Sequence, residues 1–364
     1  MAMEIVENPI TITTTEEIAP NGVKVLNEER HLLVGKTPDF IALTKVKAQM
    51  LRSVTEFFNG GDWLQIAPIP AISTLTGACE DFNTLFMLDY FGRQAFLIQT
   101  GQQHLETFIR GPIEKVYAIN QSYRSETKLP ERRLAAFTLV ECEAAYYDLH
   151  AIQTVQEQLL YKICNDVAAN CPADLKLLGA DMERLIGWDL PLPRISYTDA
   201  VQTLQAENWP IQWGEDLKGE HERRLGIMFG KPFFVEKYPG KIKFFNMHDD
   251  PENPEMVLSS DLLVPGLGEI VGSSEREHDY DELKRKLYDF TQDEKRLGKI
   301  GRIGITNGDE LRRSYQWYLD LRKDGGVPHA GFGLGFERLV QWVCNFDTIW
   351  AACEFPRNFN YLAP

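Results

Sequence analysis

Residues 329–338 constrain the fold of this chain most, because they alternate glycine with apolar residues and then lead into a predicted helix. The segment reads His-Ala-Gly-Phe-Gly-Leu-Gly-Phe-Glu-Arg. Successive side chains of a β-strand point to opposite faces, so Gly331, Gly333 and Gly335 would leave one face of such a strand bare. A ligand or another chain can approach that face closely, and Arg338 at the start of the helix can meet it. The alternative is a strand packed tightly beneath a helix.

A second segment with functional character lies between two predicted strands, at residues 116–123 and 136–142. Arg124 offers a planar fork that can hold two phosphate oxygens and stabilise charge that grows there. Glu126 projects to the same face and could accept a hydrogen bond from an adenine amino group, and Phe137 offers a flat surface for a purine. The alternative is a hairpin tip with solvated charges, because charge runs usually belong to the surface.

Two carboxylates bracket a predicted turn at residues 261–269, which read Asp-Leu-Leu-Val-Pro-Gly-Leu-Gly-Glu. Mg²⁺ near a polyphosphate takes one or two protein carboxylates and fills its octahedron with phosphate oxygens and water. Asp261 and Glu269 are therefore candidate magnesium ligands, and Arg276 could clamp a substrate carboxylate. Taken alone, an ordinary β-turn flanked by surface charges explains this segment better.

Composition limits the class of protein. With 364 residues, 44% hydrophobic and 25% charged, the chain fits a globular protein of one large domain or two smaller ones. No run approaches the roughly 18 apolar residues of a membrane helix, and no signal pattern opens the chain, so we predict a cytoplasmic protein. The six cysteines form no CxxC pair, which argues against a disulfide framework or structural metal. The net charge of −15 disfavours non-specific attraction to nucleic acid.

Hydrophobic periodicity predicts the order of the elements. Residues 1–30 show no regular apolar spacing and indicate an N-terminal arm before a single domain at residues 31–364. The predicted helices lie at residues 39–58, 147–169, 281–297, 309–323 and 337–343, and further short strands at 84–90, 94–99, 233–236, 242–247, 256–265 and 269–273. Strands in hairpins with helices in separate blocks predict an α+β fold with a mixed or antiparallel sheet.

Together these segments resemble motifs 2 and 3 and the metal-binding strand of class II aminoacyl-tRNA synthetases, in the aspartyl and asparaginyl branch. Residues around Pro68 resemble motif 1, which builds the dimer interface in that class. The resemblance is closer to the asparaginyl members, whose wording recurs at residues 100–105, 213–217, 220–223, 318–322 and 327–329. It spans about residues 31–357 and implies one catalytic domain, an antiparallel sheet flanked by helices.

The resemblance also implies roles for individual residues. Arg124 would contact the α-phosphate of ATP and act with Arg338 in catalysis, Glu126 would meet the adenine end, and Phe137 and Arg338 would sandwich the base. The other implied contacts are Arg132, Arg133, Gly333 and Gly335 for ATP, Asp261 and Glu269 for Mg²⁺, and Thr100, Gln102, Glu141 and Arg276 for the amino acid. Glu141 would receive an ammonium group and Arg276 a carboxylate or a carboxamide.

The chain departs from the family pattern near the implied amino-acid site. Thr76 and Ala136 stand where the family has glutamate, Ser273 replaces a glycine, and Trp350 replaces an arginine. Family members also place an OB-fold that reads nucleic acid before the catalytic core, and here only about thirty residues precede it.

The resemblance with these departures leads us to expect an AMP-forming amide ligase that uses ATP and Mg²⁺. It would adenylate the β-carboxylate of aspartate and pass it to ammonia, as a homodimer and without tRNA. One alternative is an amide ligase for another acid and amine. A second is an asparagine-tRNA ligase without an anticodon domain, against which the acidic balance counts. A third is a catalytically silent paralogue.

Overall fold

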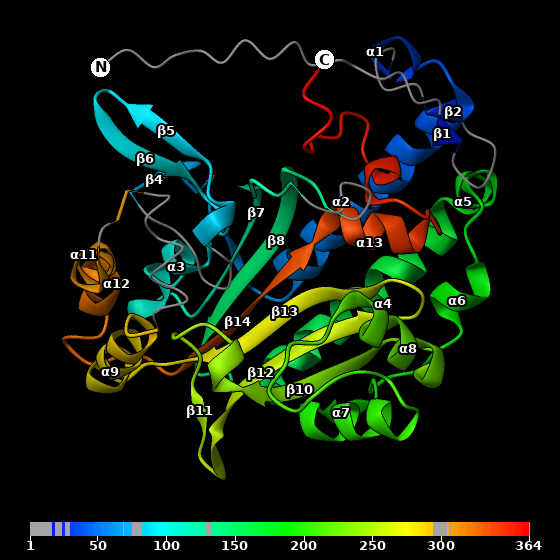
Figure 1. Cartoon of the computed structure of the whole chain (residues 1–364). Helices are drawn as coiled ribbons and strands as arrows, with labels where there is room; N and C mark the ends of the chain where they lie inside the picture. The colour runs from blue at the N-terminus through cyan, green and yellow to red at the C-terminus, as the bar shows by residue number, and fades with distance from the viewer. Residues whose placement is uncertain are drawn as a thin grey trace.

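The protein is described from a computed structural model, which covers residues 17–18, 24–25, 30–67, 69–74, 82–127, 133–293, 304–305 and 307–363. Its central strands are β3 (Leu64–Gln65), β7 (Lys115–Tyr123), β8 (Ala136–Ala145), β9 (Arg194–Ser196), β10 (Phe233–Pro239), β11 (Asp249–Asp250), β12 (Asn253–Val264), β13 (Gly268–Arg276) and β14 (His329–Gly335). Within the described residues they form one nine-stranded sheet in the order β3-β7-β8-β14-β13-β12-β10-β9, with β11 beside β12 (Figure 1). Neighbouring strands are antiparallel except β3 with β7 and β9 with β10. The predicted α+β fold is therefore confirmed.

Three helices cover one face of this sheet. They are α2 (Pro38–Gly60), α4 (Leu149–Asn170) and α13 (Phe336–Val343), close to the helices predicted from apolar spacing. Pro38 opens α2, where its missing N–H costs nothing, and the Asp148 carboxylate caps α4 by accepting a hydrogen bond from the Ala151 N–H at 2.7 Å. The helices share one apolar core with Val140, Cys142 and Ala144 of β8 and with Ala330, Phe332 and Leu334 of β14.

The opposite face of the sheet carries the side chains that point away from this core, because successive side chains of a strand point to opposite faces. On β8 this face carries Glu141 and Glu143, which lie across from Gly333 and Gly331 of β14. A Cβ at residue 331 would collide with the Glu143 carboxyl group and with the carbonyl oxygen of Cys142. One glycine of the alternating segment thus makes room for a neighbouring side chain rather than for a ligand.

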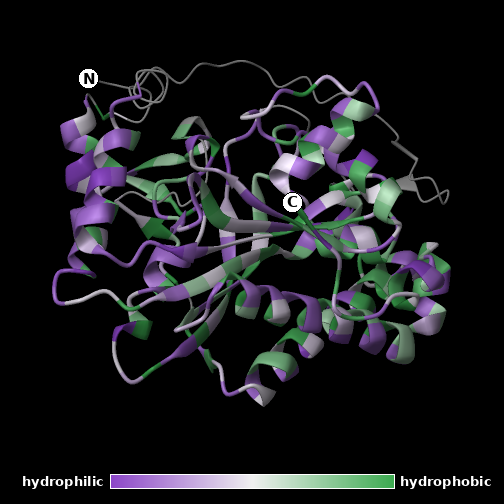
Figure 2. Ribbon diagram, turned by 90° about the horizontal axis from the view of Figure 1, so that it is seen from below, coloured by the Kyte–Doolittle hydropathy of each residue, from purple (hydrophilic) through white to green (hydrophobic). Residues whose placement is uncertain are grey.

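The remaining helices pack around these layers. They are α1 (Arg30–Leu33), α3 (Gln102–Leu105), α5 (Pro172–Leu178), α6 (Met182–Ile186), α7 (Tyr197–Ala206), α8 (Gly219–Phe229), α9 (Tyr280–Phe290), α11 (Gly308–Ser314) and α12 (Gln316–Asp320). Among them, α5 contacts α2 and α4, α6 contacts α4, α8 contacts β12 and β13, and α3 contacts β8 and β14. A small sheet is formed by β4 (Ile72–Ser73), β5 (Met87–Tyr90) and β6 (Arg93–Leu97), of which β5 and β6 are the predicted hairpin. Hydrophobic colouring runs along the central strands, whereas much of the outer helical surface is hydrophilic (Figure 2). None of the described helices is long and apolar enough to cross a membrane.

Three predicted elements differ from the structure. Residues 242–247 form no strand, because Phe244 and Phe245 are both buried in an aromatic cluster with α9, α11 and α12, whereas a strand would turn one of them outward. The helix predicted at residues 309–323 is divided at Tyr315 into α11 and α12. The helix predicted at residues 281–297 ends at Phe290 as α9, and residues 294–297 lie outside the described part. Of the N-terminal arm, only β1 (Glu17–Ile18) and β2 (Lys24–Val25) are described before Arg30.

Candidate active site

A cavity of about 990 Å³ lies over the glycine-bearing face of the sheet. The predicted residues that line it are Thr100, Gln102, Arg124, Arg133, Glu141, Asp261, Glu269, Arg276, Gly333 and Arg338. They come from segments more than two hundred residues apart, so it is the sheet order that brings them together. Glu126, Phe137 and Gly335 are not among its lining residues. Arg132, Thr76 and Pro68 lie outside the described residues.

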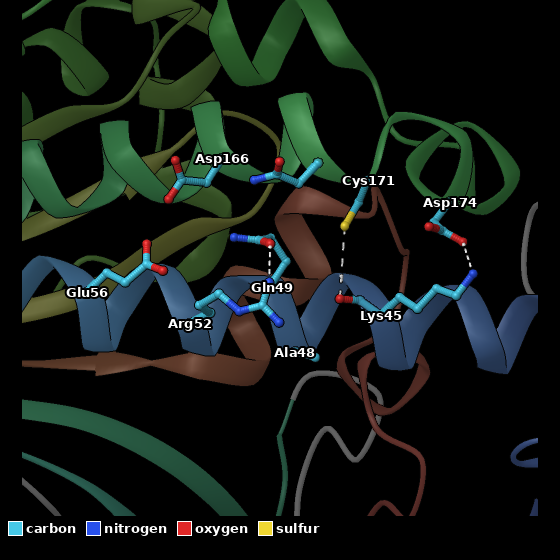
Figure 3. Close-up of a pocket in the computed structure, with 9 residues that line it drawn as sticks. Lys45, Ala48, Gln49, Arg52, Glu56, Asp166, Cys171 and Asp174 are labelled. Carbon is cyan, nitrogen blue, oxygen red and sulfur yellow. Dashed lines mark hydrogen bonds and ion pairs between the residues drawn. The ribbon is translucent and has the colours of Figure 1, made fainter.

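A second groove, of about 570 Å³, lies between α2 and the helices α4 and α5 (Figure 3). Lys45 on α2 forms an ion pair with Asp174 at 3.5 Å, and its carbonyl oxygen faces the thiol of Cys171 at 4.0 Å. The other lining side chains are a mixture of amides and charges of both signs. None of the predicted site residues lies in this groove, so the cavity over the sheet is the candidate site.

The two candidate magnesium ligands face each other across the β12–β13 pair. Asp261 pairs with Gly272 in the sheet, and a side chain at Gly272 would lie 3.2 Å from Oε1 of Glu269 and 3.7 Å from Oδ1 of Asp261. The other oxygen of each carboxylate already faces a cation, since Lys243 Nζ lies 3.1 Å from Asp261 Oδ2 and Arg338 Nη1 lies 3.3 Å from Glu269 Oε2. One oxygen of each carboxylate is thus left over the bare glycine, an arrangement that fits Mg²⁺ with two protein ligands.

The charges around these carboxylates perturb their protonation. Burial raises the pKa of Asp261 to about 6 although Lys243 opposes the rise, and Glu269 adds to it. Burial would raise the pKa of Glu269 as well, but Arg338, Lys243 and Arg124 together hold it below its usual value. Perturbed carboxylates in a cavity are typical of functional sites.

The side of the cavity that is predicted to bind phosphate is built around Arg124, which follows directly after β7. Its N–H bonds the Ala135 carbonyl at 2.9 Å, and its guanidinium lies 4.9 Å from the centre of the Phe137 ring. A purine on Phe137 therefore needs the other face of the ring or a small shift of Arg124. Glu126, the predicted adenine contact, forms an ion pair with Arg133 across the same loop.

The end of the cavity that is predicted to bind the amino acid holds a buried ion pair. Nη2 and Nε of Arg276 donate to the Glu143 carboxylate at 2.8 and 3.4 Å, and Nη1 donates to the Ser274 hydroxyl at 2.6 Å. Glu143 and Arg276 are 1% and 4% exposed, so water screens neither charge. At least three of the five donors of Arg276 are thus engaged inside the protein, and the residue also lines the cavity.

Glu141 lies beside this pair and is held by neutral donors. Its carboxylate accepts hydrogen bonds from the Gly101 N–H at 2.9 Å, from Asn120 Nδ2 at 2.9 Å and from the hydroxyl of Thr100. Because no described cation pairs with it within salt-bridge distance, its charge remains available to an ammonium group. Gln102, from the same short segment as Thr100, donates its amide to Glu106 at 3.0 Å.

A buried hydrogen-bond and ion-pair network around Glu106 lies next to Gln102 at this end of the cavity. The Tyr318 hydroxyl donates to Glu106 at 2.8 Å, Arg322 forms an ion pair with the same carboxylate, and His329 Nε2 lies 3.1 Å from it. Burial alone would raise the pKa of Glu106, but Arg322 and His329 hold it well below its usual range. The segments that carry Gln102 and the start of β14 are thereby tied together.

Among the residues that line or shape the cavity and were not predicted are Lys243, Glu222 and Glu143. Lys243 looks like any surface lysine in the sequence, and Glu222 lies in α8, where its Oε2 accepts the Glu269 N–H at 3.2 Å. Burial and the neighbouring Glu269 raise the pKa of Glu222 to about 7. Glu143 could have been found, because it lies two residues beyond Glu141 on a strand and so shares its face.

The site therefore combines two arginines, one lysine and a carboxylate pair at one end with the Glu141 carboxylate and the Arg276–Glu143 ion pair at the other. Cations of this kind stabilise negative charge that develops on a phosphoryl group. The geometry suits the attack of a small amino acid on a nucleotide phosphate.

Comparison with known proteins agrees with this geometry. The chain is 37% identical over 363 residues to the asparagine–tRNA ligase of Thermococcus gammatolerans, and the matched region covers 100% of this chain and 78% of that relative. It is 36% identical over 345 residues to the asparagine–tRNA ligase of Pelotomaculum thermopropionicum, and this match covers 94% of this chain and 75% of that relative.

Solved structures similar to this chain also include asparaginyl-tRNA synthetases. The asparaginyl-tRNA synthetase of Pyrococcus horikoshii, complexed with asparaginyl-adenylate, superposes with a TM-score of 0.82 at 39% identity, over 93% of this chain and 73% of that one. The Entamoeba histolytica asparaginyl-tRNA synthetase gives a TM-score of 0.78 at 29% identity, over 93% and 72%. The family model for class II tRNA synthetases (D, K and N) matches residues 23–359, and the chain therefore belongs to this family of ligases.

Proposed function

We propose that this protein activates asparagine with ATP and transfers it to the 3′ end of a tRNA. An oxygen of the α-carboxylate attacks the α-phosphorus of ATP, the bond to the β-phosphate oxygen breaks, and pyrophosphate leaves with that electron pair. A terminal ribose hydroxyl of the tRNA then attacks the activated carbonyl carbon, loses its proton, and AMP leaves. Proximity and electrostatics carry both steps, so no protein nucleophile is needed.

The residues of the phosphate end would act as fixed charges. Arg124 would hold the α-phosphate and neutralise the charge that grows as the carboxylate attacks, and Arg338 would face the nucleotide from the first turn of α13. Asp261 and Glu269 would hold Mg²⁺, which polarises phosphate oxygens when bound. Because Lys243 and Arg338 already orient these two carboxylates, they need little rearrangement to accept the ion.

The observation that carries the choice of amino acid is the ion pair between Arg276 and Glu143. A substrate carboxylate would compete with Glu143 for the same guanidinium, whereas the neutral carboxamide of asparagine would not. Arg276 can donate to the carboxamide oxygen while Glu143 or a neighbouring oxygen accepts from its NH₂ group. The free α-ammonium group would be received by Glu141.

This proposal departs from the amide ligase expected from the sequence. That reaction requires the side-chain carboxylate of aspartate where the Arg276–Glu143 pair lies, and the relatives at 37% and 36% identity carry the name asparagine–tRNA ligase. Both observations favour the tRNA-ligase alternative. Ser273, which lines the cavity, and Ala136, at the start of β8, both replace residues of the family pattern, and they keep the amide ligase as the second candidate.

We further propose that residues 31–364 act as one catalytic domain and that two copies pair through α2 and β3, the elements that resemble motif 1. Supporting this, α2 packs against α4 and β3 within one apolar core that also holds the strands of the cavity.

A product assay distinguishes the two candidates. The protein is incubated with ATP and Mg²⁺, once with labelled asparagine and tRNA and once with labelled aspartate and ammonium. We expect label on acid-precipitable tRNA and AMP that depends on asparagine. Free asparagine formed from aspartate and ammonium, with no label on tRNA, would instead establish the amide ligase.

A further inference from the structure

A second cluster of potential metal ligands lies outside the candidate active site. His248 precedes β11, and Glu277 and His278 follow directly after β13. One ligand atom of each lies within 4.8 Å of the corresponding atoms of the other two. The two imidazole rings lie 5.3 Å apart between centroids, and Nδ1 of His248 lies 3.2 Å from Oε2 of Glu277.

These distances are close to those of a zinc site. Zn²⁺ binds imidazole nitrogen and carboxylate oxygen at about 2.0–2.2 Å in a tetrahedron, which places neighbouring ligand atoms about 3.3–3.5 Å apart. The His248–Glu277 pair already has that spacing, and His278 needs only a small side-chain movement. Two imidazoles with one carboxylate suit Zn²⁺ or a similar transition metal, whereas Mg²⁺ prefers oxygen ligands alone.

The backbone holds the cluster in place. The His248 N–H bonds the carbonyl of Glu275 at 3.0 Å, the Glu277 N–H bonds the carbonyl of Asn246 at 2.8 Å, and between them Met247 pairs with Arg276. The second carboxylate oxygen of Glu277 accepts the Asp279 N–H at 3.1 Å, the kind of outer hydrogen bond that orients metal-binding carboxylates. Glu277 is buried and both histidines are partly exposed, so an ion has a path from solvent.

One cation faces the cluster from α9. Lys286 Nζ lies 3.4 Å from Glu277 Oε2, but it also donates to the carbonyl of Met247 at 2.6 Å and to the Asp249 carboxylate at 2.7 Å. Its two shorter contacts are thus made to groups outside the three ligands. The other described cluster of this kind, Glu106, Glu143 and His329, is different, because Arg322 and Arg276 occupy it and both guanidinium groups bond its carboxylates.

We infer that His248, Glu277 and His278 form a binding site for a zinc-like transition metal, with water as the fourth ligand. The site does not depend on the proposed function. It ties the end of β13 to the segment before β11, and Arg276 and Met247, the residues next to its ligands, both line the catalytic cavity. A bound ion would therefore clamp the amino-acid end of that cavity.

Titration with Co²⁺, followed by visible absorption, tests the site in the full chain. The titration is done in excess Mg²⁺, so that the carboxylates of the catalytic cavity are occupied. We expect one Co²⁺ per chain with the strong absorption of a four-coordinate site, displaced by Zn²⁺. His248→Ala and His278→Ala should each weaken binding at least about tenfold, whereas His150→Ala, an exposed histidine on α4, should not.

The opposite results would overturn the inference. These are no stoichiometric binding by the unmodified protein, or equal affinity in His248→Ala, His278→Ala and His150→Ala. Circular dichroism and melting temperature of each variant show whether it is folded. If either alanine variant is not, His248→Gln or His278→Gln replaces it, since glutamine keeps the volume and removes the imidazole ligand.

Discussion

Replacing Gly331 by alanine tests the packing of the sheet beneath the cavity. The new Cβ would overlap the Glu143 carboxyl group and the carbonyl oxygen of Cys142, and the second of these belongs to the backbone of β8 and cannot turn aside. Gly333→Ala is a matched control two residues along the same strand, because the nearest atom to its Cβ would be Cγ of Glu141 at 3.9 Å, an ordinary contact.

The magnitude follows from the two contacts. Overpacking a well-filled interior costs about 1–3 kcal/mol, and separating one partner of a buried ion pair costs about 3–5 kcal/mol. We therefore expect Gly331→Ala to lower the free energy of unfolding by at least about 3 kcal/mol, a large part of the 5–15 kcal/mol typical of folded proteins. Gly333→Ala should change it by less than about 1 kcal/mol.

Urea unfolding followed by tryptophan fluorescence measures both variants. The midpoint for Gly331→Ala should fall clearly below that of the unmodified protein, and the midpoint for Gly333→Ala should not. Equal midpoints for the two variants would refute the reasoning, because Glu143 would then not lie against β14, and its pairing with Arg276 would lose its structural basis.

Further predictions concern single charges. Lys243→Met should tighten Mn²⁺ binding to the nucleotide-free protein at least about a hundredfold, because a single and a double positive charge about 5 Å apart repel by about 7 kcal/mol at an effective dielectric constant near 20; unchanged electron paramagnetic resonance titrations would count against it. In ATP–pyrophosphate exchange, Glu143→Gln should lower the preference for asparagine over aspartate by about a hundredfold. Glu157→Gln, which changes another buried glutamate near an arginine, should leave that preference unaltered. Burial raises the pKa of Glu337, so the contribution of this residue to stability is present at low pH and is lost as the pH rises through the raised pKa. Between pH 5 and pH 8, the melting temperature of Glu337→Gln should therefore fall less than that of the unmodified protein. Parallel curves of melting temperature against pH would contradict this.

Local patterns in the sequence predicted the parts of the fold that depend on one element. The apolar stripe of α4 and the alternating glycines of β14 each follow from the geometry of a single helix or strand. Residues 242–247 were wrongly predicted as a strand because their burial depends on α9, α11 and α12, which lie far along the chain. Residues 170–231, for which no individual element was predicted, contain the helices α5 to α8, and helices this short depend on packing against the rest of the protein.

The candidate site shows the same division. Arg124, Asp261, Glu269 and Arg338 could be selected because their chemistry and spacing are specific. Lys243 could not, because its partner Asp261 is brought to it only by the pairing of β12 in the sheet, and no local pattern distinguishes it from a solvated lysine. The pairing of Arg276 with Glu143 likewise depends on strand order, and it favours asparagine as the substrate over the aspartate expected from the sequence.

The most direct test of the central claim is a crystal structure of the protein with Mg²⁺ and a non-hydrolysable analogue of asparaginyl-adenylate. We predict the phosphate against Arg124, an ion between Asp261 and Glu269 above Gly272, and the carboxamide against Arg276. An analogue bound elsewhere, or bound in this cavity with its phosphate away from Arg124 and no ion at the carboxylate pair, would contradict the account.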